Sequence, residues 1–121
     1  MRTIFASVVF AVLVLSGSSF AGDIGCPAGT TPNSETTPDV SEAWCETIKE
    51  GKTVMHGPYR SWWPNGKLGN QGQYNYGQMT GRWHAWHENG KLQGDESYAK
   101  GGKVKGLYWD KNGHKTQEPK T

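Results

Sequence analysis

From about residue 57 onward, apolar and polar residues alternate in short runs, and glycine-bearing turns separate the runs. The clearest example, residues 81–94, reads GRWHAWHENGKLQG. Alternation with a period of two predicts β-strands whose side chains point to the two faces in turn. An Asn-Gly dipeptide between two such runs is typical of a hairpin with a type I′ turn. The pattern therefore predicts an all-β protein made of antiparallel hairpins.

The hairpin pattern repeats along the chain with a period of about 23–25 residues, which lies within the range of repeat architectures. The Asn-Gly dipeptides that mark the repeats begin at Asn65, Asn89 and Asn112. Two and a half units occupy residues 57–80, 81–105 and 106–118, and residues 119–121 form a tail. Such a series predicts an open meander in which each hairpin packs on the next. The predicted turns are Asn65-Gly66, Asn89-Gly90 and Asn112-Gly113.

Aromatic residues fall on both faces of the predicted sheet. With a two-residue Asn65-Gly66 loop, Trp63 pairs with Leu68, and Trp63 shares a face with Tyr59. Two interpretations stay open: residues 22–56, with Trp44, cover one face and complete a core, or one aromatic column is an exposed binding surface. The candidates for that surface are Tyr59, Trp63 and Trp83 on one face, and Trp62, Trp86 and Trp109 on the other.

The N-terminal part of the chain has a different pattern. Residues 22–43 contain three prolines and no apolar periodicity, which predicts irregular structure. Residues 44–56 predict a strand and a turn at Glu50-Gly51. We therefore expect an irregular segment over residues 22–50, before repeats over residues 51–118. Cys26 and Cys45 are the only cysteines, and we expect one disulfide between them to pin this segment.

The stretch from residue 1 to residue 21 predicts a secretory signal peptide. Arg2 precedes an uncharged apolar run over residues 4–15, and small residues lead to a cleavage site after Ala21. The run is shorter than the roughly 20 residues that span a bilayer. An exported protein, periplasmic or secreted, is expected. Cys26 lies too far from the apolar run to favour a lipoprotein.

Charge is almost balanced in total but uneven along the chain. Residues 22–50 hold six acids and one base, whereas residues 51–121 hold eleven bases and five acids. The basic part is interspersed with acids and does not predict binding to nucleic acid. The two parts are either two solvated surfaces, or the acidic segment folds back onto the basic one.

No motif in the sequence predicts an enzyme. A P-loop, HExxH, GxSxG and CxxC are all absent from it. His84 and His87 are the nearest approach to a metal pair, but a spacing of three on a strand points them to opposite faces. The carboxylates that could serve glycoside chemistry fall on turns or exposed strands: Glu88, Asp95, Glu96 and Asp110. We expect no catalytic activity, no metal and no cofactor.

The unit GxWxxWxxNGxL, followed by GxYxxGxxxG, resembles the bacterial variant of the MORN repeat found in YwqK-type antitoxin proteins. The resemblance covers about residues 51–118. The residues that carry it are Gly81, Trp83, Trp86, residues 88–92, Gly94, Tyr98 and Gly101, with Gly57, Tyr59, Trp62, residues 65–68, Gly72, Tyr74 and Gly77 in the preceding unit. It implies an elongated meander of hairpins and a protein that acts by binding a partner protein.

The signal peptide and the cysteine-bearing segment are not features of that repeat, and they favour an exported role. We expect a non-enzymatic interaction module that binds another protein, with antitoxin-like or immunity-like action as one form. The alternatives are binding to envelope polysaccharide through stacked rings, and binding to anionic lipid through Lys100, Lys103 and Lys105. An open meander also leaves two edge strands, which are natural sites of self-association.

Overall fold

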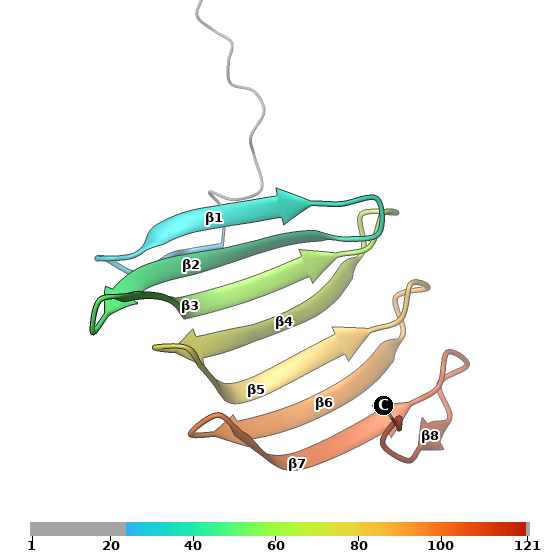
Figure 1. The fold of residues 1–121 in the computed structure, drawn as a ribbon. Helices are drawn as coiled ribbons and strands as arrows, with labels where there is room; N and C mark the ends of the chain where they lie inside the picture. The colour runs from blue at the N-terminus through green and yellow to red at the C-terminus, as the bar shows by residue number, and fades with distance from the viewer. Residues whose placement is uncertain (1–23, 121) are drawn as a thin grey trace, which may run out of the picture.

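The structure is a computed structural model that describes residues 24–120, so the predicted signal peptide and its cleavage site after Ala21 lie outside the described residues. Eight strands form one antiparallel sheet in which sequence neighbours are also sheet neighbours (Figure 1). The strands are β1 (Thr31–Thr36), β2 (Ser41–Lys49), β3 (Lys52–Trp62), β4 (Leu68–Asn75), β5 (Gln78–Trp86), β6 (Leu92–Ala99), β7 (Gly102–Trp109) and β8 (Lys115–Thr116). Residues 24–120 contain no helix. The predicted all-β open meander is confirmed.

The Asn-Gly dipeptides close the hairpins β3–β4, β5–β6 and β7–β8, with a longer loop than predicted. The amide of Gly66 donates to the carbonyl of Trp63 (2.8 Å), and the amide of Trp63 donates to the carbonyl of Lys67 (2.8 Å). Gly66 has a φ of 87°, whereas φ of Asn65 is not positive. This is a type I turn followed by a left-handed glycine, as in three-residue hairpin loops. The predicted type I′ geometry is therefore wrong here, and equivalent bonds close the other two turns.

The extra loop residue shifts the strand register by one position. Leu68 pairs with Trp62, not with Trp63, and the register also shifts between Ser61 and Trp62. Trp63 instead lies at the turn edge, where its indole donates to the carbonyl of Trp86 in the next repeat (2.9 Å). The predicted pairing of Trp63 with Leu68 is wrong because it assumed a two-residue loop.

Type I′ geometry occurs at the opposite edge of the sheet. Glu50-Gly51, Tyr76-Gly77 and Lys100-Gly101 each join two strands through two residues, and both residues have positive φ. Positive φ at both central positions defines the type I′ turn, which matches the twist of the flanking strands. The predicted turn at Glu50-Gly51 is confirmed.

Side chains tie consecutive Asn-Gly turns together. The amide nitrogen of Asn65 donates to the carbonyl of Glu88 (2.8 Å), and that of Asn89 donates to the carbonyl of Lys111 (2.8 Å). In both turns the Asn Oδ1 also accepts the backbone amide two residues further on (2.9 Å). Each of these asparagines thus fixes its own loop and holds the next one in line.

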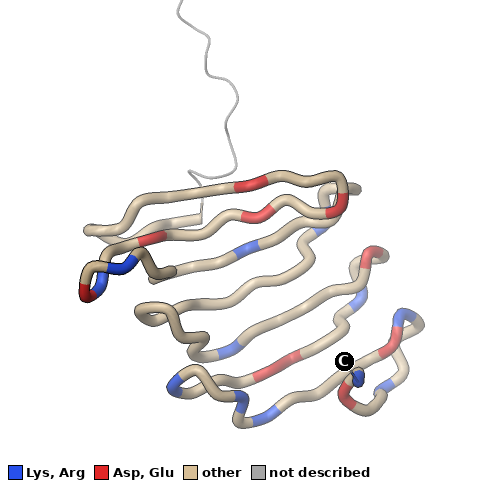
Figure 2. Tube along the Cα trace, in the orientation of Figure 1, with Lys and Arg blue, Asp and Glu red and all other residues tan. Residues whose placement is uncertain are grey.

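The N-terminal segment extends the sheet. It is irregular over residues 24–30, but residues 31–36 and 41–49 form β1 and β2. The irregular structure predicted over residues 22–50 is therefore wrong for residues 31–36 and 41–43, whereas the strand predicted from residue 44 is present in β2. Pairing with the long strand β3 outweighs the proline signal, and Pro32 lies on the edge strand, where a missing N–H is tolerated. Acidic residues lie along β1 and β2 (Figure 2). These strands join the sheet edge to edge through β3 and do not fold over the basic strands.

The predicted disulfide between Cys26 and Cys45 is confirmed, with 5.6 Å between the two Cα atoms. It holds residues 24–30 against one face of β2. Ile24, Ala43 and Cys45 form a small buried core there, and Trp62 packs at its margin. The N-terminal residues therefore cover the β2–β3 end of one face, and the larger aromatic cluster of the molecule lies on the other face.

Candidate binding surface

One face of the sheet carries a row of aromatic rings from β3 to β7. The centroid of the Trp83 ring lies 5.6 Å from that of Tyr59, 5.2 Å from that of Tyr74 and 6.3 Å from that of Tyr98. These separations and the tilted or edge-on orientations are those that aromatic pairs favour. We call this surface the ring face and define it by Tyr59, Tyr74, Trp83, Tyr98 and Tyr108.

Two glycines give the rings room against the sheet. A Cβ atom on Gly72 would lie 2.1 Å from the Trp83 ring, and one on Gly106 would lie 2.4 Å from the Tyr108 hydroxyl oxygen. Trp83 is only 7% exposed and Tyr108 only 9% exposed, although no second layer covers this face in residues 24–120. The indole of Trp83 also donates to the carbonyl of Gln73 (3.2 Å). The row is therefore packed and fixed in orientation.

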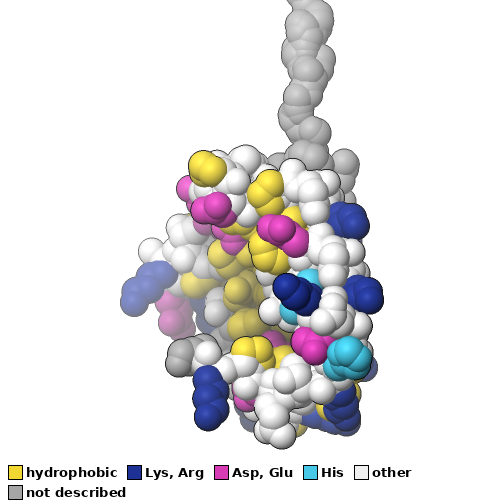
Figure 3. Space-filling view, turned by 90° about the vertical axis from the view of Figure 1, so that its right-hand side faces the viewer, with side chains coloured by type: hydrophobic (Ala, Val, Ile, Leu, Met, Phe, Trp, Pro, Cys, Tyr) yellow, Lys and Arg dark blue, Asp and Glu magenta, His cyan; other side chains and the backbone are white. Residues whose placement is uncertain are grey.

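The ring face is hollowed. Seen from the right-hand side of Figure 1, hydrophobic side chains gather in a hollow with acidic side chains at its margin (Figure 3). A cavity of about 320 Å³ lies on this face between β4 and the C-terminal residues, and this volume falls at the lower end of the range for small-molecule sites. Its lining residues include Asn70, Ala85, Gly94, Glu96, Tyr108 and Glu118.

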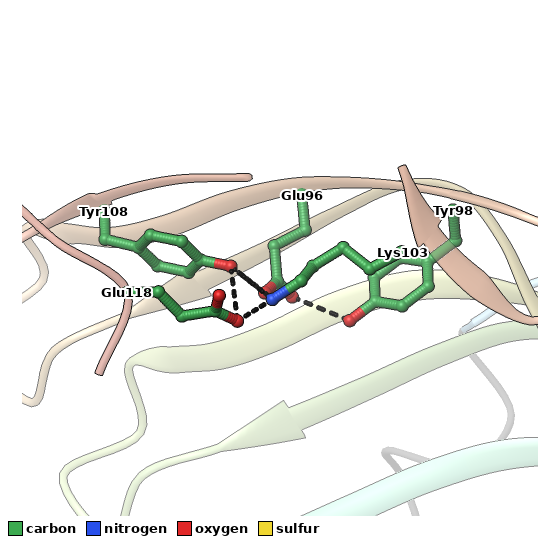
Figure 4. Close-up of polar contacts among 5 residues, drawn as sticks. All are labelled: Glu96, Tyr98, Lys103, Tyr108 and Glu118. Atoms are coloured by element: carbon green, nitrogen blue, oxygen red, sulfur yellow. Dashed lines mark hydrogen bonds and ion pairs between the residues drawn. The ribbon is translucent and has the colours of Figure 1, made fainter. Parts of the chain in front are cut away.

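A network of polar side chains borders the cavity (Figure 4). The Tyr108 hydroxyl accepts a hydrogen bond from the ammonium of Lys103 (2.9 Å) and donates one to Glu96 (2.5 Å). The Tyr98 hydroxyl donates to the other oxygen of Glu96 (3.0 Å). Lys103 also pairs with Glu118, which reaches the ring face from the C-terminal residues. Two carboxylates and two phenols thus surround one ammonium.

Burial and neighbouring carboxylates raise the pKa of the tyrosine hydroxyls on the ring face. Burial, and then the hydrogen bond to Glu42, raise the pKa of Tyr59 well above its ordinary value. Burial also raises the pKa of Tyr74, and burial with the Glu96 hydrogen bond raises the pKa of Tyr98 and Tyr108. The ring face therefore keeps its phenols protonated and carries its negative charge on carboxylates.

The opposite face carries the other tryptophan column, interrupted by charged pairs. Along β3, β5 and β7, strand alternation places Trp62, Trp86 and Trp109 on the face opposite to the ring face. Between them, Arg82 binds Asp95 through two hydrogen bonds (3.1 and 2.6 Å), and this contact lowers the pKa of Asp95. This face is therefore a mixture of half-buried rings and ion pairs.

The histidines lie apart from one another. His84 approaches Asp95 (3.5 Å), and Nε2 of His87 lies 2.8 Å from the carbonyl of Trp109 at the turn edge. Over residues 24–120, no three His, Cys, Asp or Glu side chains converge as metal ligands. The same residues include no helix long and apolar enough to cross a membrane.

The structure brings together only part of the predicted surface. Tyr59 and Trp83 lie in contact on the ring face, Trp63 lies at the turn edge, and the other three tryptophans lie on the opposite face. Asp95 and Glu96, both expected on exposed polar strands, are partly buried and point to opposite faces. The sequence interpretation missed the roles of Lys103, Tyr108 and Glu118. Gly72 and Gly106 were the available signal, because a glycine within a strand often marks a close approach.

No protein-family model matches the chain, and no curated protein or solved structure matches it either.

Proposed function

We propose that this protein is an exported, non-enzymatic interaction module that binds another protein through the ring face. The disulfide is consistent with a location outside the cytoplasm. The observation that carries the proposal is the row of mutually packed, partly exposed rings in a hollow that no second layer covers within residues 24–120. Buried aromatic anchors supply most of the affinity in typical protein interfaces.

The ring face is a better candidate than the opposite face. Its rings are held by ring-to-ring contacts and by the close approach of Trp83 to Gly72, so little side-chain freedom is lost on binding. The opposite face is partly covered by residues 24–30, and Arg82 and Asp95 neutralise each other there.

A protein partner also fits this surface better than polysaccharide or lipid. Stacking on a sugar needs an open ring face, whereas Trp83 is 7% exposed and lies against Gly72. Lys103 is held in the ring-face network, while Lys105 lies near Asp95 on the opposite face. Lys103 and Lys105 therefore do not share one patch for anionic lipid. The MORN-like motif supports antitoxin-like or immunity-like action as one form of this function.

The test is site-specific photo-crosslinking in the native host. A photoreactive amino acid is placed at Tyr74 on the ring face or, as the matched control, at His84 on the opposite face. Both side chains are partly buried. Position 74 is expected to give one discrete adduct with a second protein, to be identified by mass spectrometry, and position 84 is expected to give none.

The opposite distribution of adducts, or equal yields from both positions, would contradict the ring-face assignment. Adducts consisting only of a second copy of this chain would indicate self-association through the sheet. In every case the melting temperature of each substituted protein is measured, so that misfolding is not taken for lost binding.

A further inference from the structure

The sequence departs from the repeat pattern at three positions that meet on the ring face, one in the second unit and two in the third. Counted from the Asn-Gly turn of each hairpin, Glu96 occupies the position of Gly72, Gly106 that of Trp83, and Tyr108 that of Ala85. In the sheet, Glu96 pairs with Gly106, and its carboxylate accepts a hydrogen bond from the hydroxyl of Tyr108. A carboxylate that lines the hollow, Glu96, thus stands at the repeat position where Gly72 makes room for Trp83.

The charges at this place do not balance. Glu96 and Glu118 share one cation, the ammonium of Lys103. One ammonium between two carboxylates leaves one negative charge without a partner in the network. The side chains of Glu96 and Glu118 remain 25% and 57% exposed, so both can accept a further ligand.

The 320 Å³ cavity of the ring face lies directly beside these carboxylates. It is lined by the small residues Ala85 and Gly94 and by the polar residues Asn70 and Gln93. Amide oxygens and carboxylates both accept hydrogen bonds, and neither an ammonium nor a guanidinium has any acceptor of its own. The lining therefore suits a ligand that carries positive charge and several donors.

We infer that this cavity takes a lysine or arginine side chain of the protein partner, with Glu96 and Glu118 as the anions that hold it. The inference rests on the proposed function and specifies the chemistry of the partner. Lys103 shows how such a cation lies against this site, through its charge and through a hydrogen bond to a phenol oxygen. The incoming side chain lies on the cavity side of Glu96, where Ala85 and Gly94 leave room.

The experiment is an NMR titration of the oxidised protein with N-acetyl-arginine amide, followed at the backbone amides of Ala85 and Gly94. The matched neutral probe is N-acetyl-citrulline amide, which has almost the same shape. We expect saturable shifts with the arginine probe in the millimolar range and none with citrulline. Glu118→Gln is expected to lower the affinity for the arginine probe by roughly threefold to tenfold, because it removes one charge-assisted hydrogen-bond acceptor. Glu35→Gln, on the distant strand β1, is expected to change nothing.

Equal shifts with both probes, no saturation, or an unchanged affinity in Glu118→Gln would overturn the inference. Tighter binding of choline than of the arginine probe would also overturn it, because choline's quaternary ammonium offers no N–H to the carboxylates. These outcomes are separable from failure of the proposed function. If position 74 crosslinks a partner but the arginine probe does not bind, only the cation site is wrong.

Discussion

Adding a single methyl group at Gly72 tests the packing of the ring face. The Cβ of Gly72→Ala would lie 2.1, 2.2 and 2.6 Å from three atoms of the Trp83 ring system. Two of these atoms belong to the ring fusion, so no flexible chain end can move aside. Overpacking of a core costs about 1–3 kcal/mol, and complete loss of a packed tryptophan costs about 3–5 kcal/mol. We therefore expect Gly72→Ala to lower the free energy of unfolding by about 2–4 kcal/mol.

Gly94 provides the matched control on the same face. Its Cβ would meet Tyr108 at 3.4 Å and Ala85 at 3.9 Å, which are ordinary contact distances, and neither glycine has a positive φ. Alanine in a strand is favoured over glycine by about 0.5–1 kcal/mol. Gly94→Ala is therefore expected to be neutral or slightly stabilising. Both variants are measured by urea denaturation of the oxidised protein, with far-ultraviolet circular dichroism as the signal.

A double-mutant cycle identifies the group that the new methyl meets. In a Trp83→Ala background the obstacle is gone, and Gly72→Ala is expected to cost less than about 0.5 kcal/mol. Equal costs for Gly72→Ala and Gly94→Ala, or an undiminished cost in the Trp83→Ala background, would refute the ring-on-glycine packing.

Three further outcomes concern the disulfide, the turns and the tyrosines. Cys26→Ser opens a bridge of sequence separation 19 and should lower the free energy of unfolding by about 3 kcal/mol; a reducing agent should destabilise the wild type similarly and leave the variant unchanged. Asn89→Ala should cost about 1 kcal/mol in urea denaturation, because it removes two bonds of its turn. Equal loss in Asn112→Ala, whose side-chain amide has no such partner within residues 24–120, would contradict this account. Four tyrosines have a pKa raised above 10.0, so the folded state holds protons that the unfolded chain releases, and stability present below pH 10 should fall as pH rises further. Their tyrosinate absorbance should appear above pH 10 with unfolding, whereas ordinary titration in the folded protein would contradict the burial of Tyr59, Tyr74, Tyr98 and Tyr108.

The repeat spacing predicted the meander because alternation and turn residues are local signals. The loop geometry was harder, since Asn-Gly suits both a two-residue loop and the last two positions of a three-residue loop. Bonds between neighbouring turns, such as that from Asn65 to the carbonyl of Glu88, become visible only when repeats lie side by side. One residue of loop length decides whether Leu68 pairs with Trp62 or with Trp63.

Strands β1 and β2 show a tertiary effect that outweighs local preference. Prolines and polar residues predicted irregular structure, but the disulfide holds residues 24–30 against β2, and β3 offers a long edge for pairing. The cavity was not predictable for a related reason. Its carboxylates, Glu96 and Glu118, are far apart in the sequence, and the tail residue reaches the ring face only after the short strand β8 ends.

Binding of a protein to the ring face is tested by the affinity of the crosslinked partner for two variants. Once the partner is purified, calorimetry is used to compare Tyr74→Ser, on the ring face, with Trp86→Ser, on the opposite face. Each variant is required to keep the native circular dichroism spectrum. We expect at least about a tenfold loss of affinity for Tyr74→Ser, as for an interface anchor, and little change for Trp86→Ser. Unchanged affinity in Tyr74→Ser, together with loss in Trp86→Ser, would contradict binding at the ring face.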